Sequence, residues 1–401
     1  MKLGYAQIEI TPALDRPVYL AGFGQNRCAE SIHDPLYARM LAISGGATTL
    51  VLCALDLIGV FQSDVRDIIQ GVRQICEFFE TSKISVILAS THTHHGPDTM
   101  GLWGPDDRTR GVDPLYLADL KDKIIQTIQR SLVLDFEVAA VKSGAVRVPG
   151  VAKNARDPEI VDDELTVLQF LDADGRPLST LFDFPCHPEV LWEHNPHITS
   201  DYPASLRRAV EAETGAPCIF FSGALGGMMT PDVQDHSFAE AEAMGLTLAH
   251  AGLSLLRESD GASPSTLLFK HREFSARLQN PLFKIAIRRD LLPEPRDSHG
   301  CVTSETNLIQ IGDCWLVTVP GELLPKLGLE IKHKLRNAGA TVTGIIGLAN
   351  DELGYILPKQ NYRYPLNPLN PKDHYEETMS ISKEIGPRLM EAVDRMLKAK
   401  G

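Results

Sequence analysis

A strand-like run, a helical pattern and a second strand-like run in direct succession restrict the fold of this chain most strongly. Residues 48–60 and 84–89 are apolar and read as buried strands. Between them, apolar residues recur at helical spacing over 65–76, and Ser63 stands where an N-cap is expected. A succession of this kind predicts a right-handed crossover between parallel strands.

The rest of the chain continues the alternation. Residues 166–185 and 308–319 each read as two strands joined by a glycine-containing turn. Amphipathic helices are expected at residues 115–132, 202–213, 237–256, 323–336 and 380–398. We therefore expect an α/β fold of mixed β-sheets with flanking helices, in one domain over residues 1–401. Proline, glycine, serine and charged residues predict an excursion at about 258–305.

Charge and composition exclude several kinds of partner. The formal net charge is −13, and the chain lacks the clustered lysines and arginines that bind nucleic acid. No apolar stretch approaches the ~20 residues of a transmembrane segment, and the first residues do not read as a signal peptide. The seven cysteines form no C-x-x-C pair, which is typical of buried thiols in a reducing compartment. We expect a cytoplasmic protein without a transmembrane segment, and the sequence leaves its oligomeric state open.

Chemically reactive side chains gather just past the ends of predicted strands. They are His92, His94, His95, His187, Glu322 and Tyr355. In open α/β sheets, sites are built in the crevice beyond the carboxyl ends of the strands. One histidine at such a place is usually structural, but three within four positions indicate a functional site.

The donor types in this group favour a metal site. Zinc prefers imidazole nitrogen and carboxylate oxygen and, in catalytic sites, keeps one position for water, which suits His92, His187 and Glu322. Residues two apart in an extended segment point the same way, so His94 should share a cavity with His92. We expect one Zn²⁺ per chain, whose bound water has a pKa of roughly 7 and attacks at neutral pH. Manganese and iron accept the same donors.

At these positions the chain resembles the neutral ceramidase family, in order along nearly its whole length. The matching segments are residues 4–12, 21–23, 32–33, 37–39, 56–57, 61–63, 91–97, 154–156, 184–188, 200–202, 320–322 and 347–362. The most specific is Thr91-His92-Thr93-His94 followed by Gly96-Pro97. The resemblance implies the fold and the zinc dependence of the family's catalytic domain.

The resemblance also implies roles for individual residues. The family's zinc ligands fall on His92, His187, Glu322 and Tyr355, and the residues that line its substrate site fall on His94, Arg156 and Tyr362. His95 is an additional histidine, which we group with the substrate-binding candidates. The guanidinium of Arg156 would suit a carboxylate or a polar head group.

The segment 227–232 departs from the family. Where the family has Gly-Asp-x-Ser-Pro, with a serine proposed to be catalytic, this chain has Met228 and Thr230. Thr230 keeps a hydroxyl and stays a catalytic candidate, but its branched Cβ restricts χ1, so attack by zinc hydroxide is favoured. We also expect the family's C-terminal β-sandwich domain to be absent, because a helix ends at Lys398.

These residues predict hydrolysis of an amide bond by metal-activated water. His94 or Tyr355 would stabilise the oxyanion, and a neighbouring histidine or tyrosine would protonate the leaving amine. The expected substrate is an N-acyl lipid such as ceramide or another N-acyl or peptide-like amide. An ester or lactone would suit the same metal site. A ligand-binding protein without activity is the non-enzymatic alternative, favoured by the altered 227–232 segment and opposed by the four retained metal ligands.

Three further residues have two interpretations each. Asp56 and Asp201 are either hydrogen-bond partners of the metal-binding imidazoles or plain loop acids. Cys186 is the one thiol next to a candidate histidine and could be the nucleophile of a metal-free hydrolase, but the chain has no G-x-S-x-G elbow. A buried structural cysteine is the favoured interpretation.

Overall fold

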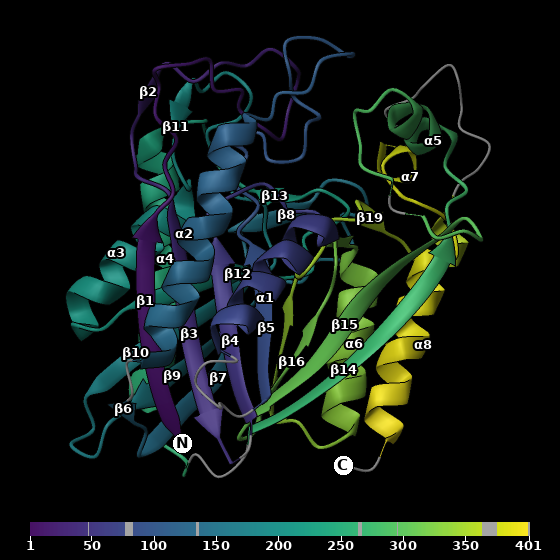
Figure 1. The fold of residues 1–401 in the computed structure, drawn as a ribbon. Coiled ribbons are helices and arrows are strands. Elements are labelled where there is room, and N and C mark those ends of the chain that lie inside the picture. The colour runs from purple at the N-terminus through teal and green to yellow at the C-terminus, as the bar shows by residue number, and fades with distance from the viewer. Residues whose placement is uncertain are drawn as a thin grey trace.

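Mixed β-sheets with helices on their outer faces form the molecule, which confirms the expected fold class (Figure 1). The computed structural model describes residues 1–46, 48–76, 83–133, 136–263, 267–294, 296–362 and 375–399. Within these ranges, no helix combines the length and the apolar character that a bilayer crossing requires.

The first sheet has the strand order β5-β4-β3-β1-β6. Its strands are β1 (Lys2–Glu9), β3 (Tyr37–Gly45), β4 (Thr48–Leu55), β5 (Lys83–Ser90) and β6 (Phe136–Glu137). β4 and β5 are parallel and are connected through α1 (Gln62–Cys76), so the predicted parallel crossover is confirmed. α2 (Pro114–Val133) packs against β1 and β3.

The predicted N-cap at Ser63 is wrong. α1 already begins at Gln62, whose backbone N–H donates to Asp351 Oδ1 at 3.0 Å. A carboxylate far along the chain thus satisfies one of the free N–H groups of the first helical turn. No local sequence pattern could reveal this partner.

The second sheet has the order β12-β10-β9-β7. Its strands are β7 (Ala140–Arg147), β9 (Glu164–Leu171), β10 (Pro177–Phe184) and β12 (Cys218–Ser222). β9 and β10 form the antiparallel hairpin that the sequence predicts, whereas β10 and β12 are parallel. α3 (Tyr202–Thr214) and α4 (Phe238–Glu258) pack against each other and against this sheet.

The third sheet has the order β14-β15-β16-β18 and is covered by α6 (Pro325–Asn337) and α8 (Ile385–Lys398). Its strands are β14 (Leu267–Arg277), β15 (Cys301–Ile311), β16 (Cys314–Thr318) and β18 (Val342–Ile346). β15 and β16 confirm the second predicted hairpin. β14 falls inside the expected excursion but belongs to the sheet, so residues 278–300, with α5 (Pro281–Arg288), are the part that leaves it.

Short two-stranded ladders fix the loops beyond these sheets. They pair β2 (Ser31–Ile32) with β11 (His197–Ile198), β8 (Ala152–Asn154) with β13 (Met229–Pro231), and β17 (Glu322–Leu323) with β19 (Tyr355–Ile356). A 3₁₀ turn (Lys359–Asn361) and α7 (Tyr375–Thr378) follow. Leu50, Leu168 and Leu316, one from each large sheet, share a buried cluster, so the sheets enclose a common core.

Candidate metal centre and pocket

His92 enters the site from the loop after β5. Its backbone has a φ of 67°, in the left-handed region, and its N–H donates to Leu57 O at 2.9 Å. The imidazole Nδ1 lies 2.6 Å from Ile58 O, which accepts a hydrogen bond from it. Because Nδ1 carries the proton, Nε2 keeps a lone pair, and burial lowers the pKa of His92 to about 3.

His187 is held in the same way after the end of β10. Its Nδ1 donates to Met229 O at 2.8 Å, and its Nε2 lies 3.1 Å from Glu322 Oε2. The same carboxylate oxygen lies 3.7 Å from His92 Nε2. Burial lowers the pKa of His187, but the charges of Glu189 and Glu322 outweigh this effect and raise the pKa to about 9. Two backbone-anchored imidazoles therefore aim Nε2 at one buried carboxylate, which is the donor set that a divalent cation needs.

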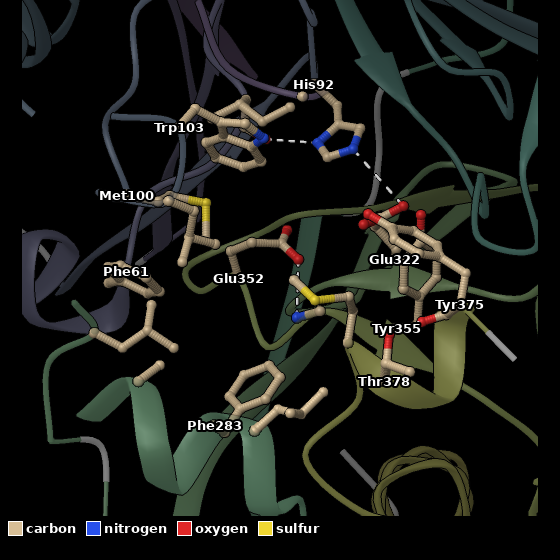
Figure 2. A pocket seen from close by; sticks show the side chains of 18 of the residues that line it. Phe61, His92, Met100, Trp103, Phe283, Glu322, Glu352, Tyr355, Tyr375 and Thr378 are labelled. Carbon is tan, nitrogen blue, oxygen red and sulfur yellow. Dashed lines mark hydrogen bonds and ion pairs between the residues drawn. The ribbon is translucent and has the colours of Figure 1, made fainter. Parts of the chain in front are cut away.

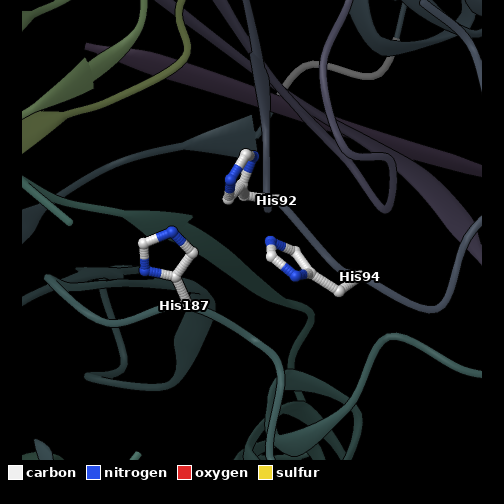
Figure 3. Close-up of side chains that lie close together, drawn as sticks. All are labelled: His92, His94 and His187. Atoms are coloured by element: carbon white, nitrogen blue, oxygen red, sulfur yellow. The ribbon is translucent and has the colours of Figure 1, made fainter. Parts of the chain in front are cut away.

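His94 completes a compact group with the other two histidines (Figure 3). Its ring centroid lies 5.1 Å from that of His92 and 5.4 Å from that of His187. One ring nitrogen from each of the three lies within 4.8 Å of the others, so this buried group could hold a metal ion. His94 shares the cavity with His92 as expected, but through the left-handed turn at His92 and not through an extended segment.

Glu322 and Tyr355 reach this group from the β17–β19 ladder. They are register partners in a parallel pair, so their side chains lie on the same side. Tyr355 is buried, and its hydroxyl lies 3.5 Å from Met228 Sδ. Burial and the charge of Glu322 raise the pKa of Tyr355 well above its ordinary value, so the phenol is neutral and can donate.

Glu189 and Thr230 lie next to the histidines, on the side of His94. Glu189 is fully buried, and its Oε2 lies 3.0 Å from His94 Nδ1. The Thr230 hydroxyl neighbours the same carboxylate and helps to lower its pKa. Although burial raises it, the charges of His94 and His187 lower the pKa of Glu189 to about 2. Glu189 therefore stays ionised behind His94.

An apolar pocket of about 150 Å³ opens onto the candidate metal centre (Figure 2). His92, His94 and Glu322 lie at its polar end. Its apolar lining consists of Ile58, Phe61, Met100, Leu102, Trp103, Leu282, Phe283, Ala286, Leu292 and Met379. Engineered cavities of this size bind benzene, so the pocket has room for a compact apolar group.

Glu352 is an exception in that lining. Its side chain is 6% exposed, and its Oε1 accepts a hydrogen bond from the Gly354 N–H at 2.9 Å. Its Oε2 is buried and has no hydrogen-bond partner among the described residues. Burial and the charge of Glu322 raise the pKa of Glu352 well above its ordinary value. A buried polar atom without a partner is costly, and such atoms often mark functional sites.

Three predicted substrate-binding residues lie outside the pocket lining. Arg156 donates to Glu376 Oε2 at 2.5 Å and to Glu377 Oε1 at 2.8 Å, so its guanidinium is occupied by the α7 acids. Tyr362 packs in a small cluster with Tyr355, and its hydroxyl lies 3.5 Å from Glu377 O. His95 is fully buried, with Nδ1 3.1 Å from Asn195 and Nε2 3.6 Å from Asp201. Their substrate contacts stay predictions.

Asp56 and Asp201, proposed as partners of the metal-binding imidazoles, contact other groups, and Asp201 lies beside His95. Asp56 accepts two hydrogen bonds of 2.8 Å from Arg207 and one from the Tyr37 N–H. Asp201 caps α3 through the Tyr202 N–H, and burial raises its pKa to about 7. The Nδ1 partners of His92 and His187 are backbone carbonyls, which sequence reasoning cannot identify because every residue has one.

Sequence reasoning also missed Glu189, Glu352 and the pocket residues of α5 and α7. Glu189 stands two residues after His187, and that spacing was its one available signal. Phe283 belongs to a segment without a recognisable motif, and Glu352 lies in the 347–362 segment but was given no role there. Tertiary folding brings the two side chains to one pocket (Figure 2).

The protein is similar to known proteins in its three-dimensional structure. Neither protein-family models nor curated proteins match the sequence. The crystal structure of neutral ceramidase from Pseudomonas aeruginosa superposes with a TM-score of 0.79 at 17% identity, over 99% of this chain and 74% of that one. A ceramidase complexed with C2 gives a TM-score of 0.76 at 16% identity with the same coverage. The chain therefore has the fold of these ceramidase structures, as the sequence resemblance predicts.

Proposed function

We propose that this protein is a zinc-dependent hydrolase that cleaves the amide bond of an N-acyl substrate. The observation that carries the proposal is the convergence of His92 Nε2 and His187 Nε2 on Glu322 Oε2, with both Nδ1 atoms anchored by carbonyls. The anchored Nδ1–H groups direct both Nε2 atoms to one position, and a bound cation would displace the proton that the neighbouring carboxylates favour on His187. The fold supports amide hydrolysis as well, because both solved structures that share it are ceramidases.

His92, His187, Glu322 and Tyr355 would hold the metal. A bound zinc ion supplies a Lewis acid and a water molecule whose pKa is near 7. Tyr355 has a second proposed role: its phenol, which is neutral because burial and the charge of Glu322 raise its pKa, would donate toward the oxyanion.

His94 is the proton-transfer residue in this proposal. Glu189 Oε2 faces Nδ1 at 3.0 Å and favours a proton there, which leaves Nε2 for exchange with substrate. His94 Nε2 would accept a proton from the attacking water and then deliver it to the leaving amine nitrogen. Thr230 acts through Glu189, because its hydroxyl helps to keep the pKa of that carboxyl low.

The apolar pocket selects the acyl group. Phe61, Met100, Trp103 and Phe283 surround a space of about 150 Å³ next to His92 (Figure 2). Burying an apolar group there gains about 25 cal/mol per Å² of surface removed from water. The preferred substrate is therefore an N-acyl amine with an apolar acyl chain, such as an N-acyl lipid. The carbons of the acyl chain nearest to the carbonyl would occupy the pocket.

The test combines metal analysis with hydrolysis of N-acyl amines by wild type, His92→Ala and His187→Ala. About one zinc per chain in wild type, with loss of metal and activity in both variants, is the expected result. His333→Ala is the matched control, because His333 is exposed on α6 and should change neither readout. Wild-type protein that takes up no transition metal on reconstitution would overturn the proposal.

A further inference from the structure

α5 forms one wall of the pocket mouth and projects beyond the third sheet, beside α7 (Figure 1). Phe283 and Ala286 line the pocket. Figure 2 shows Phe283 on the same side of the pocket as Glu352. Leu282 lines the pocket as well and is 49% exposed. The inner face of α5 therefore forms part of the pocket wall. The apolar surface of the helix extends from this wall to the solvent-exposed Leu282.

The outer face of α5 combines apolar and basic side chains. Leu282, Ile285 (44% exposed) and the exposed Arg289 stand at helical spacing, and the exposed Arg288 stands four residues after Lys284. Lys284 is half-buried on the same helix. Among the described residues, Lys284, Arg288 and Arg289 form no ion pair, and the exposed Asp290 follows them in a chain whose net charge is −13. α5 thus gives one side of the pocket mouth a local excess of basic and apolar side chains in an acidic protein.

We propose that α5 docks the pocket mouth onto an anionic lipid surface. Leu282 and Ile285 enter the interface, and Lys284, Arg288 and Arg289 meet the head groups, which is the arrangement of interfacial amphipathic helices. The acidic remainder of the surface is repelled by such a lipid layer, so docking orients the pocket toward it.

The pocket volume favours a lipid surface over a second protein. A space of about 150 Å³ takes only a compact part of a long-chain substrate, so the rest of the chain must stay outside, at the rim that α5 provides. At a lipid surface that remainder can stay among the acyl chains. This last step rests on the proposed function, whereas the docking itself follows from the α5 side chains.

The test is co-sedimentation with vesicles of phosphatidylcholine and phosphatidylglycerol in equal parts, against phosphatidylcholine alone. Wild type should bind the mixed vesicles, and salt should weaken the binding. Each cation near an anionic surface changes partitioning about fivefold, so the double variant Arg288→Glu/Arg289→Glu should lose at least tenfold. Ile285→Ser should weaken binding by a smaller factor.

Matched controls separate this effect from general charge and hydrophobicity. Arg73→Glu/Arg130→Glu reverses two exposed arginines on α1 and α2, and Val133→Ser removes an apolar side chain that is 75% exposed. Both should bind vesicles like wild type. Hydrolysis of a water-soluble short-chain N-acyl amine should be unchanged in Arg288→Glu/Arg289→Glu, so failure of the proposed function would be seen separately.

Three outcomes would overturn the docking proposal. They are absence of vesicle binding by wild type, equal loss in the α5 and control variants, and a wild-type dimer in sedimentation that Ile285→Ser dissociates. The last result would mean that a second copy of the chain covers α5.

Discussion

Glu189 is the residue that best tests the proposed division of roles between metal ligands and proton-transfer residues. We expect Glu189→Gln to lower kcat by roughly 100-fold, because His94 loses the charge that favours its proton on Nδ1. KM and zinc content should change little, since Glu189 is not among the proposed ligands. Steady-state kinetics together with metal analysis give both readouts, and a loss of zinc in this variant would contradict the assigned role.

Thr230 supplies the comparison for that experiment. If Thr230 acts through Glu189, Thr230→Val should lower kcat less than Glu189→Gln does, because it removes one polar neighbour of the carboxylate and keeps the negative charge. If Thr230 were the nucleophile, the same variant would lose essentially all activity. The two readings of the altered 227–232 segment are thus separated by one substitution.

Glu352 should show opposite effects on stability and activity. Gln keeps the acceptor for the Gly354 N–H and removes the negative charge that Glu352 takes up in a buried place when it ionises. We expect Glu352→Gln to raise the free energy of unfolding by roughly 1–3 kcal/mol and to lower kcat/KM about tenfold. The raised pKa of Glu352 means that its ionisation costs stability as pH rises, so the gain should be larger at pH 8 than at pH 5. Urea unfolding at the two pH values measures this, and a uniform loss of stability would contradict it.

Among the secondary-structure elements, α7 is held mainly by charge. Arg156 binds Glu376 and Glu377, whose side chains are 5% and 0% exposed, and it also donates to Asn361 O at 3.2 Å. Tyr375 and Thr378 of the same short helix line the pocket. Arg156 therefore positions one pocket wall from outside the pocket.

We expect Arg156→Ala to raise KM about tenfold or more, because the α7 acids lose their cation and the helix leaves its place. Removing one partner of a buried ion pair typically costs roughly 3–5 kcal/mol. Arg147→Ala is the control, since Arg147 is 74% exposed in its pair with Asp163 and should leave KM unchanged. An unchanged KM with a lower kcat would instead support direct contact between Arg156 and the reacting group.

Long periodic elements could be predicted from the sequence, and short ones could not. The β4–α1–β5 crossover and the hairpins β9–β10 and β15–β16 follow from apolar periodicity, which acts over many residues. α5 and α7 span 8 and 4 residues, too few for a periodic signal. The same limit applies to the site: the motif around His92 was visible, whereas Glu189 and Glu352 take their places through tertiary contacts.

The molecule as a whole contains a buried charge network where the second sheet meets α6. Lys332 Nζ lies 2.7 Å from Asp162 Oδ2, with 2% and 1% of the two side chains exposed. Asp183 of β10 lies in the same interior and accepts a hydrogen bond from the Ile345 N–H of β18 at 3.1 Å, so it links the second sheet to the third. Burial raises the pKa of Asp183 to about 8, although the charge of Lys332 lowers it.

This raised pKa predicts how global stability depends on pH. Between about pH 4 and pH 8 the folded chain keeps a proton on Asp183 that the unfolded chain has released, so the stabilisation is complete below pH 4 and is lost as pH rises through 8. We expect Asp183→Asn to remove this slope and to gain a few kcal/mol over wild type at pH 9 relative to pH 5, as measured by urea unfolding.

Asp174→Asn, an exposed change in the β9–β10 turn, should leave the slope intact. Asp162→Asn should destabilise at every pH, because Lys332 then loses its closest partner in the interior. If Asp183→Asn instead behaves like Asp162→Asn, the Asp183 carboxyl is ionised in the folded chain and takes part in the ion pair with Lys332. In that case the contact between the sheets at this point is ionic and not a neutral hydrogen bond.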